Sequence, residues 1–159
     1  MDSSPQDEVE RAYQAGLRLL AYRPRSRQDV RQQLSGRFST HVVLQVLTLL
    51  EEQGYLDDAA FARAWRESRE AHRPRSAALI RRELQQRGIA REVADAAVSG
   101  LDEEDSAYQA GHHRLRALQG VDYITFRRRL GDYLRRRGFP SDMVRRTVER
   151  LWQEREAAP

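Results

Sequence analysis

The chain has no cysteine and no lysine among its 159 residues. Without cysteine it has no disulfide framework, no thiol nucleophile and no thiolate metal ligand, a composition compatible with a reducing cytoplasm. Without lysine it has neither an amine nucleophile nor the phosphate anchor of G-x-x-x-x-G-K-[ST] loops. The motifs G-x-G-x-x-G and G-x-S-x-G are also missing. We therefore expect a protein that is not an enzyme and has no catalytic residues.

Long apolar runs are missing as well. No apolar stretch approaches the ~20 residues that span a bilayer. The first ten residues, MDSSPQDEVE, are polar and acidic and do not resemble a leader sequence. We expect a soluble, cytoplasmic protein with no membrane partner.

Histidine is scarce, and the four histidines are His41, His72, His112 and His113. None lies in an H-E-x-x-H motif or has carboxylates at a metal-ligand spacing. Asp57 and Asp58, like the acidic run 102–105, stand where helices are predicted to begin. Capping of main-chain N–H groups explains them better than a catalytic or metal-binding pair. We predict no metal and no cofactor.

What the chain does contain is an internal repeat. The tetrapeptide RPRS occurs at 23–26 and again at 73–76. Two apolar positions, four residues apart, recur at a spacing of 50: Val30 and Leu34, Ile80 and Leu84, Leu130 and Leu134. A spacing of four places both side chains on one face of a helix. Each pair leads into a stretch that contains glycine, at 34–38, 84–89 and 134–139, and glycine commonly ends helices.

The repeat predicts an all-α fold of three tandem three-helix repeats of about 50 residues. The first helices are expected at 6–22, 57–71 and 103–118, the second at 26–36, 76–87 and 123–137, and the third at 39–53, 90–100 and 141–155. The repeats themselves are assigned to 1–56, 57–101 and 102–159. The run VVLQVLTLL at 42–50 has the composition of a buried strand, but its flanking start and stop signals favour a buried helix. We expect a thin, elongated helical body.

All 28 basic residues are arginine, and in two stretches few acidic residues balance them. Arg11–Arg37 contains seven arginines and one acid, which gives 7 − 1 = +6. Arg114–Arg146 contains ten arginines and three acids, which gives 10 − 3 = +7, although the whole chain carries only +4. Such unbalanced charge indicates an anionic partner, either nucleic acid or an acidic protein groove. Aromatic residues such as Tyr22 and Tyr123 offer base-stacking platforms, although aromatics at helical spacing are more often core.

Three segments resemble the RecX family of RecA modulators: RPRSRQDVRQQL at 23–34, VLTLLEEQGYLDDAAFARAW at 46–65, and RPRSAALIRRELQQRGI at 73–89. The resemblance extends over roughly residues 9–153. It implies a curved array of three repeats that binds the RecA filament on single-stranded DNA and inhibits its ATPase, strand-exchange and co-protease activities. The third copy has DYITF in place of RPRS, so its contacts do not transfer by alignment.

We predict ten arginines as contacts to the filament or to DNA: Arg81, Arg82, Arg127, Arg128, Arg129, Arg135, Arg136, Arg137, Arg145 and Arg146. The expected partners are the RecA filament and single-stranded DNA, with duplex DNA left open, and a monomer is the expected state. The alternative is a free-standing nucleic-acid-binding repeat protein. A helical adaptor for an acidic protein and an unrecognised enzyme follow as weaker hypotheses.

Overall fold

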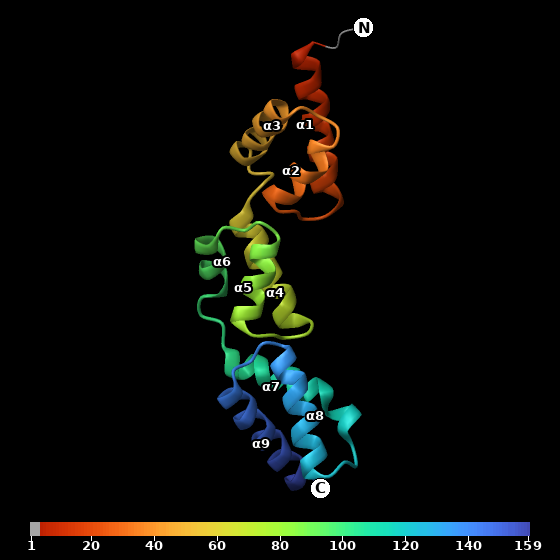
Figure 1. Ribbon diagram of the computed structural model, residues 1–159, viewed down its shortest axis with the longest axis vertical. Coiled ribbons are helices and arrows are strands. Elements are labelled where there is room, and N and C mark those ends of the chain that lie inside the picture. The colour runs from red at the N-terminus through yellow and green to blue at the C-terminus, as the bar shows by residue number, and fades with distance from the viewer. Residues whose placement is uncertain (1–3) are drawn as a thin grey trace. The chain divides into compact units, whose positions relative to one another are not determined.

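The computed structural model describes residues 4–159, and every regular element in that range is helical. Figure 1 labels the α-helices by the names used below. They are α1 (Pro5–Tyr22), α2 (Arg27–Ser35), α3 (Thr40–Glu52), α4 (Asp58–Ala71), α5 (Ala77–Gln86), α6 (Arg91–Val98), α7 (Glu103–Arg114), the 3-10 helix η1 (Leu115–Leu118), α8 (Tyr123–Arg136) and α9 (Ser141–Ala157). The predicted all-α fold of three-helix repeats is confirmed. The predicted helix ends agree to within two residues, except that the last turn predicted for α7 is the 3-10 helix η1.

Helix starts follow the expected capping chemistry. The Ser26 side chain accepts a hydrogen bond from the Asp29 N–H, and the Asp29 carboxylate accepts one from the Ser26 N–H, as the S-x-x-D pattern predicts. Asp57 accepts a hydrogen bond from the Ala60 N–H at 3.1 Å, which confirms its predicted capping role. Asp122 caps α8 in the same way, through the Thr125 N–H at 2.9 Å. The run at 42–50 lies within α3, so the helical interpretation is confirmed.

The first repeat has its own apolar core, in which α1 and α2 pack on α3. Val30 and Leu34 of α2 are buried in this core, as their spacing predicts. Gly16 allows α1 to approach α3 closely, because a Cβ atom at this position would lie 2.9 Å from Cδ1 of Leu50. Val46 and Leu50 supply the α3 side of the same contact, and neither is exposed.

The third repeat reproduces that packing with α7, α8 and α9. Gly111 of α7 stands against Leu151 of α9, where a Cβ atom would lie 2.6 Å from Cδ1. The Trp152 ring packs at 5.1 Å from Phe126, a fully buried residue of α8. Each terminal repeat therefore brings its first and third helices together through one glycine and one leucine.

The residues form two compact units, and the division passes through the second repeat. One unit contains the described residues up to Ala64 together with Leu84–Ala97. The other contains Trp65–Glu83 and Val98–Pro159. Both predicted apolar positions of the second repeat, Ile80 and Leu84, are fully buried. Each unit thus holds one terminal repeat and part of the second.

Candidate anion-binding surface

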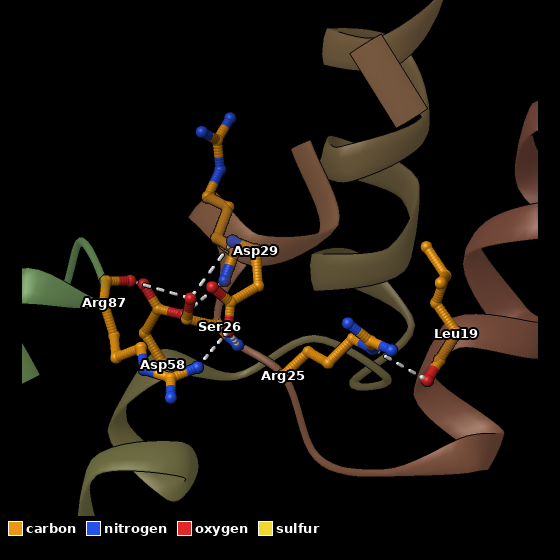
Figure 2. A network of polar contacts seen from close by, with 7 residues as sticks. Leu19, Arg25, Ser26, Asp29, Asp58 and Arg87 are labelled. Carbon is orange, nitrogen blue, oxygen red and sulfur yellow. Dashed lines mark hydrogen bonds and ion pairs between the residues drawn. The ribbon is translucent and has the colours of Figure 1, made fainter. Parts of the chain in front are cut away.

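The first RPRS segment connects α2 to residues of the second repeat that belong to the first unit (Figure 2). The Ser26 hydroxyl donates a hydrogen bond of 2.8 Å to the main-chain carbonyl of Arg87, just beyond α5. The Arg27 N–H, the first of α2, donates to the Asp58 carboxylate at the start of α4, also at 2.8 Å. Burial raises the pKa of Asp58, and this hydrogen bond opposes the rise. We call these contacts the first junction.

The second RPRS segment makes the corresponding contacts within the second unit, which we call the second junction. The Ser76 N–H donates to the main-chain carbonyl of Arg137 at 3.0 Å. The Ala77 N–H, the first of α5, donates to the Glu103 carboxylate of α7 at 2.7 Å. Both RPRS serines are buried. The repeated tetrapeptide therefore begins a helix and attaches it to the following repeat.

Each junction also requires a glycine directly after the arginine whose main-chain carbonyl accepts the hydrogen bond from the serine. Gly88 and Gly138 have φ angles of +78° and +87°, a left-handed conformation that side chains other than glycine rarely adopt. A Cβ atom at Gly88 would lie 2.5 Å from the Cβ of Gln28. At Gly138 it would lie 2.4 Å from the hydroxyl oxygen of Ser76. Glycine in these two stretches was expected to end a helix, and close packing explains Gly88 and Gly138 as well as the turn does.

Beside the second junction, two arginines approach one carboxylate, and the charge of a third arginine acts on one of them. Arg75 and Arg69 approach the Oε2 atom of Glu83 at 2.9 and 3.2 Å. Burial lowers the pKa of Arg75; Glu83 opposes this shift, while the charges of Arg69 and Arg137 add to it. Arg69 also lies 4.5 Å from the centre of the Trp65 ring. The cluster was not predicted, because its members come together only through the packing of separate segments.

Three of the ten predicted contact arginines line one groove of about 310 Å³ between α8 and α9. Arg127 and Arg135 of α8 and Arg145 of α9 line it. Gly131, between the two α8 arginines at helical spacing, is the floor; a Cβ atom there would lie 3.2 Å from the guanidinium of Arg135. The one carboxylate in the lining, Glu149, accepts a hydrogen bond from the Tyr123 hydroxyl. We call this space the α8–α9 groove.

The ten predicted arginines differ in how they are paired. Arg146 is engaged by Glu104 at 2.5 Å and by Asp142 at 3.1 Å, and these hydrogen bonds raise its pKa. Arg135 pairs with Asp132 at 3.3 Å. Within residues 4–159, no carboxylate lies within 4.0 Å of the guanidinium groups of five others, which are Arg127, Arg128, Arg129, Arg136 and Arg145. These five are exposed and keep their charge available to an anion.

The three remaining predicted arginines lie elsewhere. Arg137 is half-buried, offers its carbonyl to the second junction, and places its guanidinium 5.3 Å from the centre of the Tyr133 ring. Arg81 is half-buried on α5, whereas Arg82 is exposed there. The described chain therefore presents its predicted binding charge mainly on α8 and the start of α9.

Across the described residues, no group of three or more histidine, aspartate and glutamate side chains is arranged to hold a metal ion. In the same range, no helix combines the length and apolar character that a membrane crossing demands.

Comparison with family models matches the three repeats in order. The matches are to the RecX first three-helix domain over residues 12–50, the second over 57–98 and the third over 102–148.

Relatives match over nearly the whole chain. The Regulatory protein RecX of Streptomyces coelicolor is 37% identical over 154 residues, which cover 94% of this chain and 82% of that protein. The protein of the same name from Thermobifida fusca is also 37% identical, over 92% of this chain and 81% of its own. That from Chlorobium phaeobacteroides is 30% identical, with 90% and 95% covered.

Solved structures share the fold. The crystal structure of RecX from Lactobacillus salivarius superposes with a TM-score of 0.79 at 17% identity, over 92% of this chain and 97% of that one. A second structure, of regulatory protein RecX, gives 0.78 at 21% identity, over 91% and 73%. The arrangement of three-helix repeats is therefore common to chains of very different sequence.

Proposed function

Because this chain belongs to the RecX family of regulatory proteins, we propose that it is a negative regulator of homologous recombination and DNA repair. It binds the RecA filament on single-stranded DNA and inhibits the ATPase, strand-exchange and co-protease activities of that filament. It does so as a binding protein in the cytoplasm and not as an enzyme. This assignment gives the anionic partner that the arginine distribution requires.

The observation that carries the proposal is the set of unpaired arginines on α8 and α9. Arg127 and Arg145 face the same groove, and neither has a carboxylate within 4.0 Å in the described chain. Planar guanidinium groups donate two parallel hydrogen bonds to a phosphate or a carboxylate. The α8–α9 groove therefore suits a DNA phosphate or an acidic side chain of the filament.

Docking of this surface explains inhibition without catalysis. RecA turnover on DNA requires its subunits to rearrange and the DNA to remain accessible. A helical protein held in the filament by several charge-assisted hydrogen bonds restricts both. Inhibition by this route is stoichiometric, so it depends on how much protein is bound.

The test is a titration of RecA ATPase activity on single-stranded DNA with the wild-type chain and with an Arg127→Glu, Arg145→Glu variant. We expect the concentration for half-maximal inhibition to rise about tenfold or more, because two attractive contacts become repulsive. The matched control is Arg31→Glu, Arg63→Glu, which makes the same change in net charge at two exposed helix positions outside the groove. Equal inhibition by wild type and groove variant, with both folded, would remove the groove from the assignment.

A second candidate is a free-standing nucleic-acid-binding protein, which the same unpaired arginines favour because they need no recombinase to attract phosphate. It predicts tight binding to bare DNA. If about six phosphates are neutralised, that affinity falls on the order of a thousand-fold between about 50 and 200 mM salt. Inhibition of the filament only at concentrations that saturate the bare DNA would favour this candidate.

A further inference from the structure

The first repeat carries two adjoining hollows along α1, in residues outside the predicted contact set. One has a volume of about 330 Å³ and is lined by Arg18, Tyr22, Arg25 and Arg37 among others. The other, of about 430 Å³, shares Arg18 and Arg37 with it and extends toward the N-terminal half of α1. Both hollows lie on this repeat, and we call the two together the depression; the lining of the larger one includes one acidic residue, Glu10.

The lining of the smaller hollow is cationic. It contains three arginines and no acidic residue. Within the described part of the chain, no carboxylate lies within 4.0 Å of the guanidinium of Arg18, Arg25 or Arg37. The Arg25 Nε donates to the carbonyl of Leu19 at 3.2 Å, which holds the side chain in place while its two terminal nitrogens remain available. Three arginines that line one hollow, with no described carboxylate within 4.0 Å, favour an anion there.

Tyr22 distinguishes this hollow from a simple anion site. It is the last residue of α1 and 83% exposed. The hydroxyls of Tyr13, Tyr108 and Tyr123, by contrast, donate to Gln53, Glu154 and Glu149. Within residues 4–159 the Tyr22 side chain makes no hydrogen bond and no ring contact. Tyr22 lies four residues after Arg18, so both side chains lie on one face of α1.

We propose that this depression binds single-stranded DNA, with phosphates held by Arg18, Arg25 and Arg37 and a base stacked on Tyr22. An exposed aromatic ring beside a cationic groove is the arrangement that proteins use for unpaired bases. Duplex DNA fits less well, because its bases are already stacked on one another. An acidic peptide fits less well too, because a carboxylate gains nothing from the ring. The site uses other residues than the α8–α9 groove and requires no RecA.

The test is fluorescence anisotropy with labelled oligonucleotides of about fifteen nucleotides, within the range of single-strand site sizes. The probes are oligothymidine, an abasic strand of the same length, a duplex, and an acidic peptide. The full chain is used in an Arg127→Glu, Arg145→Glu background, which weakens binding at the other surface. We expect Tyr22→Ala to lower affinity for oligothymidine about tenfold, the loss of one stacked base, and to leave affinity for the abasic strand unchanged. Arg18→Glu with Arg37→Glu should weaken both.

Two variants make the result specific. Tyr22→Phe keeps the ring and should retain affinity for oligothymidine. Tyr55→Ala removes another exposed tyrosine, 58% exposed and outside the depression, and should have no effect. Equal loss on the abasic strand, no loss with Tyr22→Ala, or preference for the duplex or the peptide would each overturn the proposal. Because this experiment contains no RecA, a negative result would not contradict the proposed regulatory function. Likewise, a failure of the ATPase titration would not contradict this DNA-binding site.

Discussion

The two junctions begin with the same tetrapeptide and differ in what surrounds it. In both, a buried serine bonds the carbonyl of an arginine, and the next N–H donates to a carboxylate at the start of the first helix of the following repeat. In the first junction the serine hydroxyl bonds the carbonyl, whereas in the second the serine N–H does so. Both junctions therefore join a serine to an arginine carbonyl, but the donor is the side chain in the first and the main chain in the second.

The flanking residues differ further. Pro24 is exposed, whereas Pro74 is buried. Arg23 has an extended backbone with φ of −162°, whereas Arg73 has φ of +74°, which costs a non-glycine residue about 1 kcal/mol. Arg25 donates to a main-chain carbonyl, and Arg75 pairs with Glu83. The second junction is thus more buried and more dependent on side-chain charge, and substitutions should affect the two differently.

The largest losses are expected at the glycines. Gly138→Ala should lower the free energy of unfolding by about 3 kcal/mol, because it adds a steric clash with Ser76 to the cost of a positive φ. Gly88→Ala should cost as much, since its Cβ atom would lie 2.5 Å from the Cβ of Gln28, which the main chain of α2 holds in place. The measurement is urea denaturation followed by circular dichroism. The control is Gly120→Ala, which has φ of +76° but nothing within 4 Å of its Cβ position, and should cost only about 1 kcal/mol. Equal losses at Gly120 and Gly138 would show that no clash operates.

Glu83→Gln should rank second and act on the second junction. It leaves the half-buried Arg69 and Arg75 without their counter-charge, and we expect a loss of about 2 kcal/mol. Arg25→Ala, the contrasting change at the first junction, should cost about 0.5–1 kcal/mol, because it removes one hydrogen bond to a carbonyl. Thermal denaturation of the two variants in parallel provides the comparison. A larger loss from Arg25→Ala would contradict the greater role of charge in the second junction.

At the serines, in contrast, the substitution in the first junction should cost more stability than the one in the second junction. The Ser26 hydroxyl accepts from the Asp29 N–H and donates to the Arg87 carbonyl, whereas the Ser76 hydroxyl accepts from the Leu79 N–H. We expect Ser26→Ala to cost about 2 kcal/mol and Ser76→Ala about 1 kcal/mol. The denaturant midpoints of unfolding of both variants and of wild type test these two losses. If Ser76→Ala lowered stability as much as Ser26→Ala, the Ser76 hydroxyl would have a role beyond capping α5.

The smallest effect is a pH dependence at the first junction. Burial raises the pKa of Asp58 above its ordinary value, so the folded state binds a proton more readily than the unfolded state. The contribution of Asp58 to stability is therefore fully present below its unfolded pKa and is lost as pH rises through its folded pKa. Asp58→Asn keeps an acceptor for the Arg27 N–H, and its stability relative to wild type should increase across that range. Melting curves measured from acidic to neutral pH test this.

Asp122→Asn serves as a control of opposite sign. A hydrogen bond from Thr125 lowers the pKa of Asp122, so its stabilising contribution is lost as pH falls through the folded pKa. Identical pH profiles for the two variants would contradict the assignment at Asp58.

Much of the fold was predictable, because each copy has an apolar pair at helical spacing. The second and third copies add a glycine, Gly88 or Gly138, that a close packing contact requires. The sequence did not reveal that α1 and α7 pack alike in their repeats. In the structure each packs a glycine on a leucine, Gly16 on Leu50 and Gly111 on Leu151. Small residues produce no apolar periodicity, and the contact becomes visible only when the helices are packed.

The candidate surface was predictable in part. Arg127 and Arg135 share a face of α8 by their spacing, but the completion of the groove by Arg145 depends on how α9 packs. Arg146, the next residue, is engaged by Glu104, forty-two positions away, which no local pattern indicates. Arg137 was assigned to binding by its place in an arginine run, and its main-chain role in the second junction depends on a loop sixty residues earlier.

The use of main-chain carbonyls at positions 87 and 137 has a consequence for how such a chain evolves. Every amino acid supplies a carbonyl, so exchange of either arginine side chain leaves the bond to the preceding serine intact. Attachment of one repeat to the next is thus separated from the chemistry that the repeat presents. Gene duplication of a whole repeat then preserves assembly at once, while selection remains free to alter the surface of each copy toward a different partner.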